Sequence, residues 1–145
     1  MKYEFEIEDL LVAHLQDDLP DIKIFPLGEI SAQEMEMAAQ KSLKGTIYVA
    51  YKNSDYERAG NSFVYTRKMK YIILALNKTR RQRDGIYDLL DLLRDSVYLF
   101  RAFGKRCTIV NDSIDPQRTP QGLFILEMEI RFDFTMPLEM RESDK

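Results

Sequence analysis

The sequence predicts an α+β fold, a mixed, mainly antiparallel sheet with helices packed on one of its faces. Apolar residues recur at helical spacing in three segments, and β-branched and aromatic runs lie between these segments. Two pairs of these runs are joined without an intervening helix, which favours adjacent antiparallel strands. A length of 145 residues suits a single domain covering residues 1–145.

The first two helices are marked by spacing and by capping residues. Residues 5–20, FEIEDLLVAHLQDDLP, predict an amphipathic helix that ends before Pro20. Its apolar stripe consists of Ile7, Leu10, Leu11 and Leu15. Residues 31–43 predict a second helix, because Ser31 and Glu34 have the spacing of a capping box.

The third helix has the strongest pattern in the chain and is expected within residues 84–100, DGIYDLLDLLRDSVYLF. Its apolar face consists of Ile86, Leu89, Leu90, Leu93 and Val97. Aspartates and Arg94 lie on or near the other face. Gly104 follows it and is expected to take the left-handed conformation that closes a helix.

Extended segments are expected between the helices. Residues 21–28 predict a short strand, and residues 45–52 and 63–77 predict two longer ones. The polar stretch between the two longer strands, NSDYERAGNS at 53–62, predicts an exposed hairpin connection.

The C-terminal part predicts a strand at 106–110, a turn-rich loop at 111–122 and a long strand at 123–136. In the long strand, apolar residues at even positions from Phe124 to Phe134 alternate with mostly charged residues at odd positions. This alternation predicts one face in the core and the other in water or against a charged partner.

Residues for catalysis, metal binding or cofactor binding are not grouped in the sequence. The single His14 is expected to flank the first helix, and the single Cys107 to fill space in a strand. Glycines occur singly, without the spacing of a phosphate-binding loop. Glu127 and Glu129 are expected on the solvent face of a strand, where nothing raises a carboxyl pKa. We therefore expect no enzyme, no catalytic residue, no cofactor and no metal.

A run of four cations within six residues, Lys78 to Arg83, stands out because the chain has a formal net charge of −3. Three interpretations are open: a solvated loop, a contact to a negatively charged partner, or a nucleic-acid contact. Specific nucleic-acid binding is disfavoured by the acidic balance of the rest of the chain. Nothing in the sequence marks a membrane span or a secretion signal.

The stretch RKMKYIILALNKTRRQRDGIYDLLDLLRDSVY resembles Mu-like prophage and phage-tail proteins of the tail-terminator or tail-completion type. The resemblance lies in a strand such as IILALN, a polar or basic connection and a leucine-rich helix. It implies a homo-oligomeric ring, typically a hexamer, that caps the tail-tube protein, ends tube polymerisation and faces the head connector. It places the protein in the neck region of the virion, and in the host cytoplasm during assembly. DNA would only pass through the lumen.

The resemblance also implies partner contacts by exposed polar side chains. The candidates are Lys78, Arg80, Arg81 and Arg83 in the basic run, Tyr56 and Arg58 in the polar connection, and Glu127, Glu129 and Arg131 on the last strand. Residues 51–62 are expected to be disordered before assembly and ordered in the ring. Another head-tail connector or completion protein, and a small non-enzymatic adaptor domain, stay open as alternatives.

Overall fold

A computed structural model describes residues 3–136 except 59, 61 and 62. The helices are α1 (Tyr3–Asp18), α2 (Ala32–Gln40) and α3 (Ile86–Leu99). The strands are β1 (Lys23–Pro26), β2 (Thr46–Arg58), β3 (Tyr65–Asn77), β4 (Arg101–Ala102), β5 (Lys105–Arg106), β6 (Thr108–Ile114) and β7 (Phe124–Met136).

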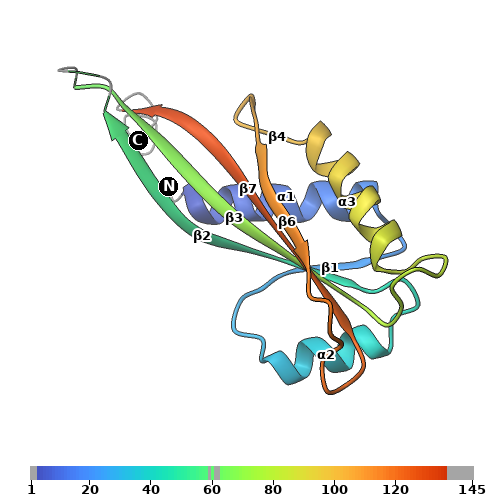
Figure 1. The fold of residues 1–145 in the computed structure, drawn as a ribbon. Coiled ribbons are helices and arrows are strands. Elements are labelled where there is room, and N and C mark those ends of the chain that lie inside the picture. Colours follow the sequence, from blue (N-terminus) through green and yellow to red (C-terminus); the bar gives the residue numbers. More distant parts are fainter. Residues whose placement is uncertain (1–2, 59, 61–62, 137–145) are drawn as a thin grey trace.

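Five strands form one twisted sheet in the order β1-β2-β3-β7-β6 (Figure 1). β1 runs parallel to β2, whereas the other three pairings are antiparallel. The short strands β4 and β5 form a separate hairpin. The predicted α+β class with a mixed, mainly antiparallel sheet is therefore confirmed.

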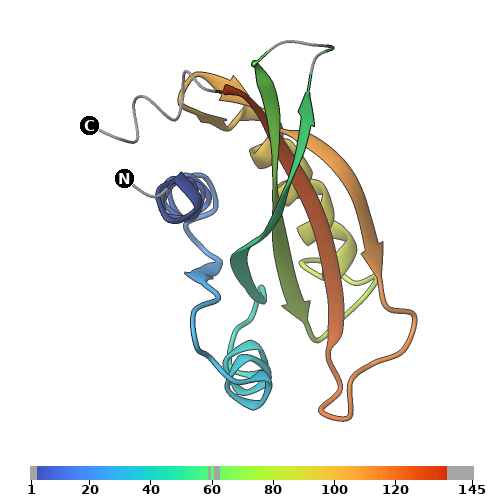
Figure 2. The ribbon, with the colours of Figure 1, turned by 90° about the vertical axis from the view of Figure 1, so that its left-hand side faces the viewer.

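The main core lies between this sheet and two helices. α1 packs over β1 and β2, and α3 packs over β3 and β7 (Figure 2). Tyr71 and Phe132 are fully buried at the centre of this core, with their rings edge to face at 5.9 Å. The predicted stripe of α1 is correct except for Leu10, which is 44% exposed, and Val12 is buried instead. Leu10 and Val12 flank the row of Ile7, Leu11 and Leu15 on its two sides, and only the Val12 side packs into the core.

The second face of the sheet is covered at one end by α2. Ala39 of α2 packs with Tyr48 and Leu76, whose strand positions face away from α1 and α3, and with Leu123, which directly precedes β7. The expectation that the helices cover one face is therefore not confirmed. Apolar residues run without alternation at this end, as in Ile47 to Val49, and such a run needs cover on both faces.

Helix ends follow the expected chemistry at α2 but not at α3. The Ser31 hydroxyl accepts a hydrogen bond from the Glu34 N–H at 3.1 Å, as the capping box predicts. Gly104 does not close α3, which ends at Leu99. Gly104 instead occupies the turn between β4 and β5, where Phe103 and Gly104 both have positive φ, +50° and +76°.

Two strands extend further than predicted. β2 continues to Arg58 and β6 to Ile114, so the predicted loops at 53–62 and 111–122 are shorter. Within the first, residues 59, 61 and 62 lie outside the described residues. The expectation of disorder is wrong for residues 51–58. This segment belongs to β2 and pairs with residues 65–71 of β3. The polar ribbon is stabilised by cross-strand ion pairs, Lys70 with Asp55 and Lys68 with Glu57, at 2.8 and 2.6 Å.

Candidate functional site

The basic run forms an ordered loop between β3 and α3. It is anchored by Asn77, a buried residue at the end of β3. The Asn77 amide nitrogen donates to the carbonyl oxygens of Asp84 at 2.8 Å and Lys44 at 3.3 Å. Its side-chain oxygen accepts from the Thr79 N–H at 3.0 Å. The two ends of the loop are thereby fixed to one side chain.

Arg80 connects this loop to the loop between β6 and β7. Its Nε donates to the Tyr87 hydroxyl at 2.8 Å, and its Nη1 donates to the Pro116 carbonyl at 3.3 Å. Its guanidinium also lies 5.6 Å from the Phe124 ring centroid, and Arg118 lies 5.0 Å from the same ring. Arg80 is thus partly buried and has a structural role as well as a charge.

The other cations of the loop face solvent. Lys78, Arg81 and Arg83 are exposed and form no ion pair with any described residue. We call Lys78, Arg80, Arg81, Arg83 and Arg118 the basic rim. The structure therefore brings the four predicted cations of this run together and adds a fifth from a separate loop.

Tyr56 and Arg58 lie on the β2–β3 hairpin, far along the sheet from the basic rim (Figure 1). Arg67, a nearly buried residue of β3, donates to Glu4 at 2.7 Å and lies 5.8 Å from the Tyr56 ring centroid. Arg58 lies 4.9 Å from the Tyr65 ring centroid and donates to its hydroxyl. Both predicted contacts thus make cross-strand interactions within the chain, although Tyr56 is 61% exposed.

The face of the sheet opposite α1 and α3 carries a band of charges beyond the end covered by α2. We call this band the charged outer face. It consists of Lys52, Asp55, Glu57, Lys68, Lys70, Glu127, Glu129, Arg131 and Asp133. Most of these side chains pair with one another, and Arg131 pairs with Asp133 at 2.9 Å. Glu127 is exposed and forms no ion pair with another described residue.

Glu129 does not lie on the solvent as predicted. It is 7% exposed, and its carboxylate accepts a hydrogen bond from Lys52 at 2.5 Å. Lys52 sits at an irregularity in β2, where the register with β3 shifts between Tyr51 and Asn53. The extra residue allows the lysine to reach across the neighbouring strand and cover Glu129.

Pairing shifts the titration of several groups on the charged outer face. Hydrogen bonds from Lys70 and Lys68 hold the pKa values of Asp55 and Glu57, respectively, below their usual range. The hydrogen bond to Glu129, together with its charge, raises the pKa of Lys52. Since each shift favours the charged form, the outer face keeps its ion pairs around neutral pH.

The single histidine and the single cysteine have structural surroundings. The His14 Nε2 lies 2.9 Å from the Ser96 carbonyl oxygen, so this partly buried ring bridges α1 and α3. Burial raises the pKa of Cys107 to about 11. A thiol with so high a pKa is a poor nucleophile at neutral pH.

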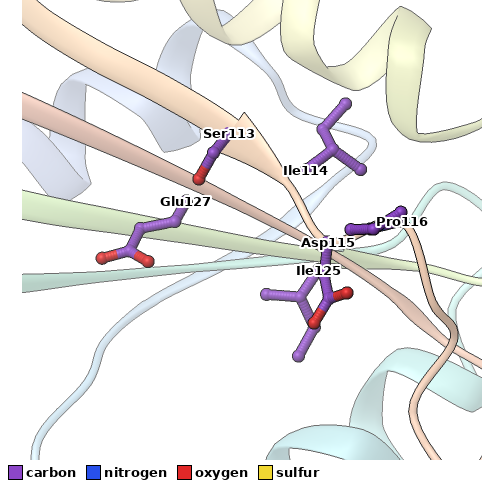
Figure 3. Close-up of a pocket in the computed structure, with 6 residues that line it drawn as sticks. All are labelled: Ser113, Ile114, Asp115, Pro116, Ile125 and Glu127. Carbon is purple, nitrogen blue, oxygen red and sulfur yellow. The ribbon is translucent and has the colours of Figure 1, made fainter.

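An open hollow of about 370 Å³ lies beside β6 and β7 on the side of the charged outer face (Figure 3). Ser113, Asp115 and Glu127 supply its polar groups, and Ile114, Pro116 and Ile125 supply apolar walls. No group of three or more His, Cys, Asp or Glu side chains suited to a metal occurs among the described residues. In that same part of the chain, no helix is long and apolar enough to cross a membrane.

Sequence reasoning missed Arg118, Asn77 and Lys52. Arg118 lies in a turn-rich loop that nothing in the sequence links to the basic run. Asn77 ends a strand directly before the basic run, and an asparagine there is a recognisable signal for side-chain hydrogen bonds to turn backbone. The pairing of Lys52 with Glu129 could not be predicted, because the sequence pattern does not reveal the β-bulge that positions Lys52.

Comparison with known proteins gives one family match. Residues 11–132 match the sequence model of a family described as Gp37 protein. No curated protein matches the chain significantly. Among solved structures, a chain in the virion of a native gene transfer agent (GTA) particle is similar to this chain, with 10% sequence identity and a TM-score of 0.44. That alignment covers 90% of this chain and 87% of the other.

Proposed function

The chain belongs to the Gp37 family, and we propose that it is a structural protein of a phage or phage-like particle that caps the tail tube as a ring. In this role it ends tube polymerisation and presents a joining surface to the head connector. It acts by shape and charge, without catalysis. Its location is the neck of the virion after assembly in the host cytoplasm.

One observation carries the proposal. The stretch that resembles tail-terminator proteins forms β3, the basic loop and α3, which follow one another directly. Asn77 and Arg80 hold this loop in place, as described above. A loop fixed in this way presents cations at constant positions, which suits a contact between rigid subunits.

The exposed polar surfaces also suit assembly. No helix of the described residues covers most of the charged outer face, and none of the described strands pairs with the outer edge of β6. Charges arranged on such surfaces set the register between subunits more than they set affinity. Subunits of a closed ring need this kind of register, because small errors in angle prevent closure.

The test is capping of tail tubes by the purified protein. Tube protein that is still polymerising is mixed with the chain, and tube length is followed by electron microscopy. We expect elongation to stop and a ring to be visible at one end of the tubes. Unchanged elongation, together with a strict monomer by light scattering, would overturn the proposal and favour an adaptor domain.

The basic loop can be examined in the same assay. Arg81→Glu with Arg83→Glu reverses two exposed charges, whereas Arg80 is left intact because it holds the loop together. The control is Arg101→Glu with Lys105→Glu, an equal charge change on the β4–β5 hairpin. If the basic loop contacts the tube or a neighbouring subunit, the first variant caps poorly and the control caps normally.

A further inference from the structure

Charge is distributed unevenly between the helical layer and the rest of the chain. α1 and α3 together carry nine carboxylates and one arginine. The remaining fifteen carboxylates of the chain stand against twenty lysines and arginines. The two helices therefore have a net charge of −8 and the remainder +5, which gives the overall −3.

The negative charge reaches solvent on α1. Asp9, Asp17 and Asp18 are exposed, and α1 contains no lysine or arginine. Two apolar side chains stand among them, Phe5 at 64% and Leu10 at 44% exposure. Asp18 points to another side of the helix than Asp17. We call the other four residues, Phe5, Asp9, Leu10 and Asp17, the acidic face. None of its carboxylates pairs with a cation of the described chain.

No ion pair links the acidic face to the basic rim within the described chain. In Figure 2, α1 stands at the left beside β1 and β2, and the loops of the basic rim lie at the lower right, near β7 and β6. Two complementary patches that the fold holds apart cannot meet within one subunit. They can meet between subunits, as a head-to-tail contact that repeats around a ring.

We propose that the acidic face of one subunit docks on the basic rim of a second copy of this chain. This pairing rests on the proposed ring function and supplies its lateral contact. Exposed Phe5 and Leu10 add apolar area at the contact, while the charges set its orientation. Symmetric pairing of two acidic faces or two basic rims is opposed by like charges.

The basic rim is organised before it binds. Arg80 is tied to Tyr87 and Pro116, and Arg118 stacks on Phe124. Because these side chains are already fixed, ordering them on association costs little entropy. The neighbouring carboxylates form no ion pair with the rim among the described residues: Asp115 accepts from the Gln117 N–H, and Asp88 accepts from the Asp84 N–H.

The experiment uses paired charge reversals in the full chain. One variant carries Arg81→Glu and Arg83→Glu, and the other carries Asp9→Lys and Asp17→Lys. All four positions are exposed and make no ion pair with a described residue, so each variant should fold. Circular dichroism and thermal unfolding of each variant verify this before association is measured.

Association is measured by light scattering over a protein and salt series. We expect each variant alone to associate about tenfold or more weakly than the wild type. In an equimolar mixture the reversed rim of one variant faces the reversed helix of the other, so association should return. The variant with all four reversals should also associate, and high salt should weaken every one of these contacts.

Matched controls carry equal charge changes elsewhere: Arg101→Glu with Lys105→Glu, and Glu29→Lys with Glu36→Lys. These should associate as the wild type does. Folded variants that associate normally alone, or a mixture that stays dissociated, would overturn the pairing. If the wild-type protein caps tubes but the charge reversals do not change association, the pairing is overturned and the capping role stands. A wild type that neither associates nor caps would overturn both.

Discussion

Asn77 gives the sharpest test of how the fold positions the basic rim. Replacing it with alanine removes hydrogen bonds to Asp84, Lys44 and Thr79, at 2.8, 3.3 and 3.0 Å. Asn77 is 2% exposed, so water has little access to the groups left behind. At about 1 kcal/mol for each bond, Asn77→Ala should lower the free energy of unfolding by about 2–4 kcal/mol.

A second substitution separates the donor from the acceptor. Asn77→Asp keeps the oxygen that accepts from Thr79 but turns a carboxylate oxygen toward the carbonyls of Lys44 and Asp84. Burial beside two carbonyl oxygens raises the folded-state pKa of that carboxyl group. The folded state then binds the proton more tightly, so this variant should lose stability relative to wild type as pH rises through the carboxyl range.

The assay is urea unfolding followed by far-ultraviolet circular dichroism, since the chain has no tryptophan. Asn111→Ala serves as control, because Asn111 is exposed on the edge strand β6. It should change stability by less than about 0.5 kcal/mol. Hydrogen exchange of residues 78–86 should become faster in Asn77→Ala. If Asn77→Ala matches the Asn111→Ala control, the loop does not depend on Asn77 and the reasoning fails.

Three further predictions concern single side chains. Gly45→Ala should lower the free energy of unfolding by about 2 kcal/mol or more. Gly45 has φ +92°, and an added Cβ would lie 2.4 Å from the Leu76 carbonyl oxygen. Urea unfolding measures this loss, with Gly28→Ala as control because an added Cβ there has no neighbour within 4 Å. Burial raises the pKa of Glu8, so its ionisation weakens the folded state as pH rises above the ordinary carboxyl pKa. Glu8→Gln should therefore gain stability relative to wild type between pH 4 and pH 7, and a relative loss would contradict this. Cys107, with its pKa of about 11, should react with iodoacetamide at pH 8 roughly a hundredfold more slowly in the folded than in the urea-unfolded chain.

Side-chain periodicity was sufficient to predict the main elements of this fold. The alternation from Phe124 to Phe134 fixes which face of β7 is buried, and all its even positions are buried. The spacing of Ser31 and Glu34 similarly located the start of α2. In both cases a local pattern determines the local structure, so no knowledge of distant contacts was needed.

Periodicity could not predict where the polar half of the β2–β3 hairpin forms. Residues such as Asn53 and Asp55 disfavour strands on their own. They adopt strand geometry here because Lys70 and Lys68 stand opposite them on β3. Such stabilisation depends on the register between strands, which a single segment does not reveal.

The candidate contact residues also divide into those that local sequence predicts and those that depend on distant contacts. The basic run was found from composition, because four cations stand close together in the chain. That Arg118 lies beside the basic run was not predictable from the sequence. Arg118 packs on the Phe124 ring and Arg80 donates to the Pro116 carbonyl, and both of these partners belong to the β6–β7 hairpin. The sequence also does not show which cations are free to bind a partner. Arg80 is largely occupied by its hydrogen bonds to Tyr87 and Pro116 within the chain.

Glu127 and Glu129 lie two residues apart on the same side of β7, yet reversing their charges should have different effects. Glu129 is 7% exposed and paired with Lys52, so Glu129→Lys places two cations together at a nearly buried position. It should cost about 3 kcal/mol or more. Glu127 is exposed and forms no ion pair with a described residue, so Glu127→Lys should stay within about 0.5 kcal/mol of wild type. Only Glu127→Lys can therefore report on assembly without also destabilising the subunit, and urea midpoints that are equal for the two variants would contradict the buried pairing of Glu129.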